Sequence, residues 1–411
     1  MRNRLGREVE LLAPAGGWEQ LRAAVHFGAD AVYLASERFG MRAQAQNFSR
    51  GELPRAVAYA HEHGVKVHVT ANIVMHEADI ALLPGYFEAL EAAGVDAMIV
   101  GDLGAMRLAR TYAPHVDVHV STQASVSNAE AALVWHELGA MRIVCAREMS
   151  VASIARMRDE LPRDLELEAF VHGAMCMAYS GRCLISDYLT GRSALKGNCT
   201  QPCRWHYVLE EDKRPGEHFP IEEDGHGSYL LNSKDLNMLA HLQGLAEAGV
   251  DSVKIEGRNK KAYYVATVVG AYRRVLDGED PAQVMHELDC VSHRPYGTGF
   301  YFGPAHQTPE SDEYERTWLW AAEVERCEPV GDGTYAVYVT CRNRFALGDE
   351  LEVVSPHVPS RPVKPLSLAL CATDPDEKDE QVELANRAME SYVIHVAEPL
   401  LPGDILRVHI P

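Results

Sequence analysis

Four cysteines stand close together in a chain of 411 residues that contains nine in all. Cys176, Cys183, Cys199 and Cys203 fall within 28 residues, with the spacing C-x6-C-x15-C-x3-C. Zinc sites favour C-x2–4-C pairs, which only the last pair approaches, whereas an iron–sulfur cluster takes four thiolates at less regular spacing. We therefore expect these thiols to hold an inorganic centre, with a [4Fe–4S] cluster favoured over zinc. Burial as small apolar residues is the simpler alternative, and we prefer it for the five scattered cysteines, Cys145, Cys290, Cys327, Cys341 and Cys371.

Charged residues alternate in the stretch DSVKIEGR (251–258). In a strand this places Lys254, Glu256 and Arg258 on one face. An arginine there can bind a carboxylate through two parallel hydrogen bonds, so the face fits an anionic substrate. The alternative is an internal ion-pair network. We predict catalytic roles for Glu256 and Arg258 and substrate binding for Lys254.

Other polar residues stand at the ends of apolar stretches. His172 ends one of them and is a predicted acid or base, with a structural hydrogen bond as the alternative. Arg147 and Gln123 end two others, and Arg204 adjoins three aromatic residues that could stack a nucleobase or shield a cluster. We predict that these three residues bind substrate. Asn72 and Asp102 are weaker candidates.

The elements that position these residues follow a repeating pattern. Short apolar stretches alternate with amphipathic helical stretches that end in glycine, which predicts a parallel sheet with helices outside. The strands are expected at 10–16, 29–36, 66–72, 96–102, 117–123, 142–148, 165–173 and 251–258. Eight such units predict a TIM-like (β/α)8 barrel with a cysteine-bearing insertion, residues 174–235, after strand seven. An open doubly wound sheet is the alternative, disfavoured because no G-x-G-x-x-G turn follows the first strand.

The pattern changes near residue 290. In residues 318–411, apolar and polar residues alternate, and the alternating stretches are separated by residues typical of turns. This pattern predicts a small all-β domain, a β-barrel or sandwich. We expect the barrel to occupy residues 1–290 and a Gly- and Pro-rich linker to occupy 291–317. No apolar run reaches the roughly 18 residues needed to span a bilayer, so we predict a cytoplasmic protein without membrane contact. The net charge of −20 argues against non-specific coating of nucleic acid, although a local basic patch stays open.

The stretch EAFVHGAMCMAYSGRCLIS (168–186) resembles the signature of the peptidase U-32 family, also called collagenase-like peptidases. LLAPAGG (11–17), NSKDL (232–236) and VKIEGRNK (253–260) are similar to further family stretches. The segment GNCTQPCRWHY (197–207) is similar to one branch, whose members form 5-hydroxyuridine at the wobble position of tRNA. The resemblance implies an oxygen-independent hydroxylation that needs prephenate and a [4Fe–4S] cluster, with the tRNA anticodon loop and prephenate as partners.

The resemblance also assigns ligands. Cys176, Cys183 and Cys199 match family thiols. Other branches place a fourth ligand just after KDL, where this chain has Asn237, so Cys203 is the natural replacement. Two other functions stay open, a collagenase-like peptidase and a non-enzymatic iron–sulfur scaffold. The first lacks sequence support because HEHG (61–64) and HEAD (76–79) do not complete H-E-x-x-H and no G-x-S-x-G occurs. The sequence also allows a homo-oligomer.

Overall fold

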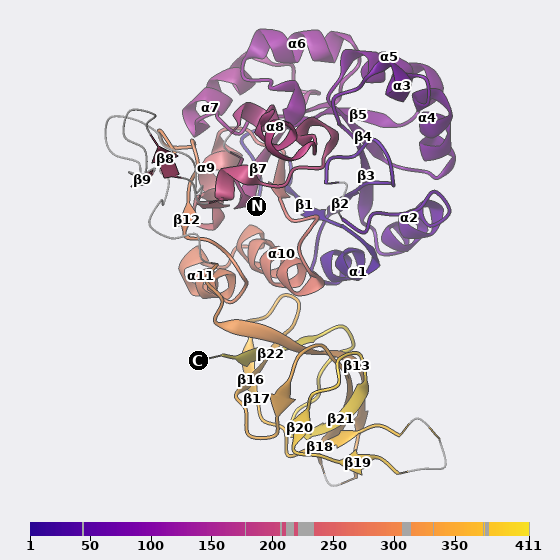
Figure 1. Ribbon diagram of the computed structural model, residues 1–411, viewed down its shortest axis with the longest axis vertical. Helices are drawn as coiled ribbons and strands as arrows, with labels where there is room; N and C mark the ends of the chain where they lie inside the picture. The colour runs from indigo at the N-terminus through magenta and orange to yellow at the C-terminus, as the bar shows by residue number, and fades with distance from the viewer. Residues whose placement is uncertain are drawn as a thin grey trace. The chain divides into compact units, whose positions relative to one another are not determined.

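Eight short strands lie parallel and side by side in a computed structural model of the chain (Figure 1). They run in the order β11-β1-β2-β3-β4-β5-β6-β7, and β11 also pairs with β7, so the sheet closes on itself. The strands are β1 (Glu10–Pro14), β2 (Ala31–Leu34), β3 (Lys66–Ala71), β4 (Ala97–Val100), β5 (Asp117–Val120), β6 (Arg142–Val144), β7 (Glu166–Ala174) and β11 (Ser252–Ile255). The closure confirms the predicted TIM-like barrel and excludes the open sheet.

The structure describes the chain apart from residues 43–44, 177, 206–207, 211–217, 221–233, 306–313, 332, 373, 375–377 and 411. Side chains of residues 204, 208–210 and 218–220 are also outside the description. None of the helices in the described residues is long and apolar enough to cross a bilayer.

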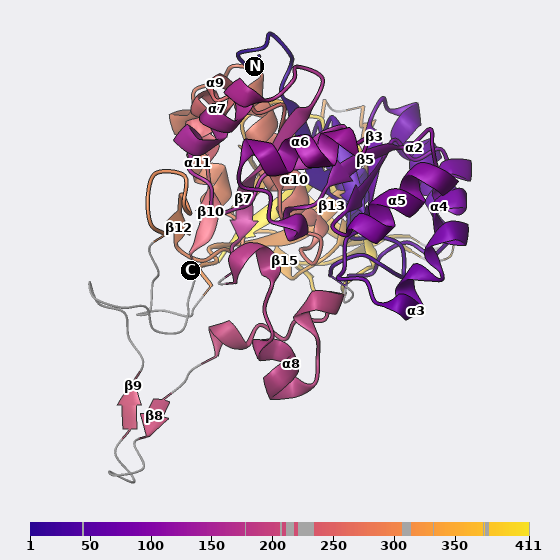
Figure 2. The ribbon, with the colours of Figure 1, turned by 90° about the horizontal axis from the view of Figure 1, so that it is seen from above.

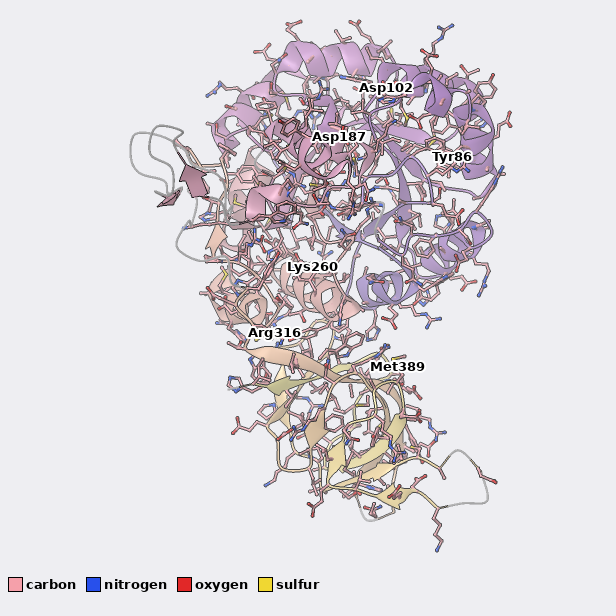
Figure 3. The ribbon with its side chains drawn as sticks, in the orientation of Figure 1. Tyr86, Asp102, Asp187, Lys260, Arg316 and Met389 are labelled. Atoms are coloured by element: carbon pink, nitrogen blue, oxygen red, sulfur yellow. The ribbon has the colours of Figure 1, made fainter. Side chains whose placement is uncertain are left out.

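Burial explains why the barrel strands read as short apolar runs. Every residue of β2, β4, β6 and β11 is buried, as expected for parallel strands that are covered on both faces. The surrounding helices include α1 (Trp18–His26), α2 (Leu53–Glu62), α4 (Leu83–Ala92), α5 (Leu103–Tyr112), α6 (Ala129–Glu137), α7 (Val151–Glu160) and α9 (Leu242–Glu247). Asp102, labelled in Figure 3, begins α5 by accepting a hydrogen bond from the backbone N of Ala105 at 3.0 Å. Asp102, which was a weak candidate for a site residue, therefore has a structural role as a helix cap.

A short strand lengthens the sheet beyond the barrel. β10 (Asp235–Asn237) runs antiparallel to the end of β7 and places Asn237 opposite His172. β12 (Tyr296–Gly297) then pairs with β10, so part of the segment expected to be a linker joins the barrel sheet. The KDL motif is thereby fixed beside the carboxyl end of β7.

The insertion after β7 contains short helical turns. They are η2 (Tyr179–Gly181), α8 (Ile185–Thr190), η3 (Ala194–Lys196) and η4 (Pro202–Arg204), followed by the strands β8 (Val208–Glu210) and β9 (His218–Pro220). Figure 2 shows α8 displaced to one side of the barrel, the same side as α3 (Glu77–Ile80). Because the insertion leaves from the carboxyl end of β7, this is the side on which barrel enzymes carry their active sites.

A second compact unit contains His26–Gly28, Ala262–Ser292 and Glu315–Pro411. It holds α10 (Ala262–Leu276), α11 (Pro281–Asp289) and an antiparallel sheet in the order β17-β16-β22-β13-β14-β21-β18-β19. These strands are β13 (Trp318–Pro329), β14 (Tyr335–Cys341), β16 (Leu351–Val354), β17 (Arg361–Val363), β18 (Ser367–Leu370), β19 (Glu380–Gln381), β21 (Ser391–Val396) and β22 (Ile405–His409). The predicted all-β domain is confirmed. Buried Arg407 of β22 binds Glu287 of α11 at 2.8 Å and so joins this sheet to that helix.

Candidate active site

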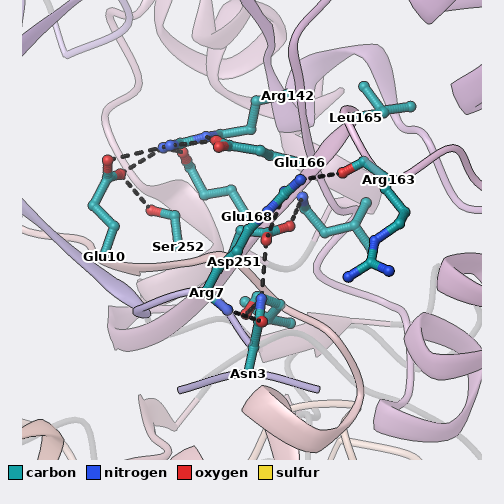
Figure 4. A network of polar contacts seen from close by, with 12 residues as sticks. Asn3, Arg7, Glu10, Arg142, Arg163, Leu165, Glu166, Glu168, Asp251 and Ser252 are labelled. Carbon is teal, nitrogen blue, oxygen red and sulfur yellow. Dashed lines mark hydrogen bonds and ion pairs between the residues drawn. The ribbon is translucent and has the colours of Figure 1, made fainter. Parts of the chain in front are cut away.

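Ion pairs fill the barrel where its strands begin (Figure 4). Arg142, the first residue of β6, binds Glu10 at 2.5 Å, Glu166 at 2.7 Å and Glu168 at 3.2 Å. Lys254 donates to the other oxygen of Glu168 at 2.7 Å. We call Glu10, Arg142, Glu166, Glu168 and Lys254 the basal network. Lys254 therefore belongs to an internal ion-pair network, which was the alternative to a role in substrate binding. Its predicted contact with substrate stays a prediction.

Glu256 lies at the opposite end of the strands, where three arginines surround it. Arg42 binds its Oε1 at 2.9 Å, and the hydroxyl of Tyr33 donates to its Oε2 at 3.2 Å. Burial would raise the pKa of Glu256, but the charges of Arg42, Arg147 and Arg258 outweigh it and lower the pKa to about 2. An ionised carboxylate of this kind orients cations well and is a weak general base. Its predicted catalytic role remains a prediction.

Arg258 and Arg147 carry the positive charge that Glu256 does not neutralise. Buried Arg258 donates to Thr70 Oγ1 at 3.3 Å, and Gly16 approaches its backbone so closely that an added Cβ would lie 1.9 Å from Arg258 O. The Arg147 guanidinium lies 3.8 Å from the centroid of the Phe170 ring and donates to Ala174 O at 2.8 Å. Within the described residues, neither arginine forms an ion pair. Glu256, Arg42, Arg147 and Arg258, which we call the arginine mouth, thus combine three cations with one carboxylate.

His172 is buried in β7 between β10 and β11. Its carbonyl accepts a hydrogen bond from Glu256 N at 2.9 Å, and its ring centroid lies 5.4 Å from that of Tyr296. Burial, with smaller effects of Lys260 and His293, lowers the pKa of His172 to about 3. The imidazole is therefore neutral at physiological pH, and its predicted acid–base role stays untested.

Hydrogen bonds and ion pairs hold the insertion against the strand ends. Glu148, in the segment that follows β6, accepts from Ser180 N at 2.7 Å and from Ser180 Oγ at 2.9 Å. Arg182 donates to Gln123 O at 3.1 Å, so the predicted residue Gln123 contacts the insertion through its backbone. Lys196 pairs with Asp79 of α3. The cysteine-bearing segment is therefore docked beside the arginine mouth.

The insertion also contacts the loop that carries Arg42. Gly197 has a positive φ of 79°, and an added Cβ would lie 2.9 Å from Arg42 N. Arg42 itself adopts a left-handed φ of 69°, which is uncommon for a residue with a side chain. The charge of Glu256 raises the pKa of Arg42. Arg42 thus pairs with the carboxylate of the mouth, and its backbone lies against the cysteine-bearing insertion.

The four clustered thiols match a metal or iron–sulfur centre in donor chemistry. None forms a disulfide; Cys176 is exposed, and Cys183, Cys199 and Cys203 are half-buried. In contrast, burial raises the pKa of Cys145 and of Cys290 to about 12, as expected for packed thiols. Among the described residues, no three His, Cys, Asp or Glu side chains lie close enough together to hold a metal ion. The donors therefore fit in type and belong to one insertion, and binding would have to draw them together.

Two features of the candidate site were not predicted from the sequence. Arg42 follows β2 in the stretch GMRAQ, and the only signal was its place after a strand end. The Glu148–Ser180 contact joins residues 32 positions apart, which no spacing rule indicates. Of the predicted aromatic group, Trp205 is exposed, whereas His206, Tyr207 and the Arg204 side chain lie outside the described residues.

The low pKa of Glu256 predicts an acid-sensitive contribution to stability. Since the folded-state pKa lies below the ordinary value of 4.5, Glu256 stabilises the fold fully above about pH 4.5, and this contribution declines as the pH falls toward 2. The difference in unfolding free energy between wild type and Glu256→Gln should therefore shrink between pH 5 and pH 2 in urea titrations. Glu62→Gln, at the exposed end of α2, should change stability by less than about 0.5 kcal/mol. A constant difference for Glu256→Gln would contradict the prediction.

Comparison with known proteins agrees with this architecture. A family profile described as Peptidase family U32 matches residues 16–311, and one described as Peptidase family U32 C-terminal domain matches 316–407. The chain is 36% identical to tRNA hydroxylation protein P1 of Bacillus subtilis over 98% of its own length and 95% of that protein. It is 39% identical to 23S rRNA 5-hydroxycytidine C2501 synthase of Escherichia coli over 66% of this chain and 39% of that protein. A Porphyromonas gingivalis protein named Collagenase is 34% identical over 72% of this chain and 74% of that protein.

Proposed function

The chain belongs to peptidase family U32, and from this premise we propose that it hydroxylates RNA. In the finer proposal, the substrate is the wobble uridine of tRNA and the product is 5-hydroxyuridine. The support for tRNA over rRNA is length, because the tRNA hydroxylation relative matches almost end to end and the rRNA relative over 39% of its length. The reaction would take place in the cytoplasm.

The observation that carries the proposal is the arginine mouth beneath a thiol-bearing insertion. Prephenate is a dicarboxylate, and Arg147 and Arg258 offer two guanidinium groups without a described ion-pair partner. Glu256 holds Arg42 in place and would keep the site from binding any anion indiscriminately. The residues of this chain would therefore bind and orient an anionic co-substrate next to the thiols.

We propose that Cys176, Cys183, Cys199 and Cys203 hold a [4Fe–4S] cluster. Such a cluster would supply one-electron redox chemistry or a Lewis-acidic iron. The supporting observations are that the four thiols form no disulfide, that they share one insertion, and that this insertion is bonded to the segments that follow β5 and β6 and to α3.

Nucleoside analysis of tRNA tests the proposed activity. A strain that lacks the protein should lose 5-hydroxyuridine and nucleosides derived from it, and expression of the wild-type chain should restore them. Unchanged 5-hydroxyuridine in the deletion strain would remove the hydroxylase proposal.

Neutralising the arginine mouth should weaken the use of prephenate. Arg147→Met and Arg258→Met each remove charged hydrogen bonds, so kcat/KM for prephenate should fall about 10- to 100-fold in each. Arg107→Met, on the exposed face of α5, is the matched control and should leave kcat/KM unchanged. Circular dichroism separates misfolding from loss of binding, and wild-type kinetics in both folded variants would contradict the assignment.

A peptidase is the second candidate because one relative is named Collagenase. A cysteine nucleophile would need a base, and His172 is the base nearest to Cys176 in sequence. His172 is 1% exposed within the sheet, whereas Cys176 is exposed, which disfavours that pair. Gelatin turnover that is lost in Cys176→Ser would support the peptidase instead.

A further inference from the structure

Exposed apolar side chains concentrate on the cysteine-bearing insertion. Of eighteen large apolar residues that are exposed in the described part of the chain, six belong to residues 179–205. They form what we call the insertion face: Tyr179, Leu184, Ile185, Tyr188, Leu189 and Trp205. Tyr188 is 89% exposed, more than any other member of the eighteen. Four of them, Leu184, Ile185, Tyr188 and Leu189, belong to α8 or its N-cap, and exposed apolar side chains grouped in this way usually mark a binding site.

Hydrogen bonds give the insertion face a fixed support. Ser186 of α8 is fully buried; its hydroxyl donates to Arg192 O at 2.7 Å and accepts from Thr200 N at 3.0 Å. α8 also lies beside η4, which directly precedes Trp205. Because Ser186 points into the insertion, its neighbours Leu184, Ile185 and Tyr188 are left on the outside. Figure 3 labels Asp187 of this helix over the barrel strands.

Charge indicates the kind of partner that fits this face. Residues 174–205 contain four basic residues and one acidic residue, in a chain whose net charge is −20. Residues 315–411 contain 9 basic and 17 acidic residues, so the C-terminal domain is the less suitable of the two for a polyanion. Aromatic side chains set among arginine and lysine residues are the usual surface for unstacked bases of single-stranded RNA loops.

We infer that the insertion face stacks bases of the tRNA anticodon loop beside the thiols, an inference that rests on the proposed function. Tyr188 and Trp205 are the principal stacking residues, and Leu184 extends the apolar surface. A second copy of the chain is the competing occupant. A two-fold dimer through this face would bring two like-charged insertions together, which disfavours it.

Affinity for tRNA tests the inference. With anaerobically purified protein and an unmodified tRNA transcript, Tyr188→Ala and Trp205→Ala should each weaken binding about 5- to 100-fold, the usual loss for one stacked base. Tyr188→Phe keeps the ring and should restore wild-type affinity. Leu138→Ala, which removes an apolar side chain that is 47% exposed outside the insertion, is the matched control and should bind normally. Iron content and circular dichroism should match wild type in all four variants.

The outcomes separate the two proposals. Wild-type tRNA affinity in Tyr188→Ala and Trp205→Ala would overturn this inference and leave the hydroxylase proposal standing. A change of oligomeric state in these variants, with tRNA affinity intact, would identify the face as a protein interface and also overturn it. Absence of tRNA binding by the wild-type protein would overturn both.

Discussion

Cys183→Ser should lose the iron centre and hydroxylation while keeping the fold. A [4Fe–4S] cluster needs ionised thiolates, and a serine hydroxyl is not ionised at neutral pH. We expect iron in anaerobically purified protein to fall from about four atoms per chain to near zero, and 5-hydroxyuridine formation to be lost with it. The same result is expected for Cys176, Cys199 and Cys203, of which Cys203 is the most informative because it replaces the ligand that Asn237 cannot supply.

The fold should survive because the insertion is held by contacts that involve no thiol. Glu148–Ser180 and Lys196–Asp79 remain in each variant. Cys327→Ser, a half-buried thiol of β13, is the matched control and should retain iron. Full iron content in Cys183→Ser, or zinc without iron in the wild type, would contradict the proposed cluster.

Glu168→Gln should be the most destabilising conservative change in the barrel. Glu168 is fully buried and binds both Lys254 and Arg142, so its neutralisation leaves two buried cations with one carboxylate fewer. Removal of one partner of a buried ion pair costs about 3–5 kcal/mol because the remaining charge stays desolvated. Chemical denaturation at pH 7 should therefore show a loss of this size.

A paired substitution separates charge from packing. In Glu168→Gln combined with Lys254→Met, the unpaired ammonium is gone, and we expect about half of the lost stability to return. Glu62→Gln serves again as the exposed control. A loss below about 1 kcal/mol for Glu168→Gln would mean that water or neighbouring groups already compensate the basal network.

Stability and chemistry should be separable between the two ends of the barrel. The basal network lies where β1, β6, β7 and β11 begin, whereas the arginine mouth and the thiols lie where strands end. A Glu168 variant that still folds should therefore bind iron normally. This division matches the general use of barrel ends, with stability at one and catalysis at the other.

The sequence by itself determined the eight strands, the insertion and the set of four thiols. Strand position follows from local patterns, because buried parallel strands need short apolar runs and glycine ends the helices between them. The alternation in 251–258 predicted one strand face for Lys254, Glu256 and Arg258, but β11 ends at Ile255, so only Lys254 of the three lies in the strand.

Only the tertiary structure decided what these side chains contact. Lys254 and Glu256 are two residues apart, yet one pairs with Glu168 at the base and the other with Arg42 at the mouth. Closure of the barrel places β11 between β1 and β7. Lys254 thereby meets Glu168, which is 86 positions away in the sequence, and Glu256 meets Arg42, which is 214 positions away. Such pairings depend on the path of the whole chain. Strand order and register determine which side chains meet across a barrel, and these contacts produce no periodic pattern in the sequence.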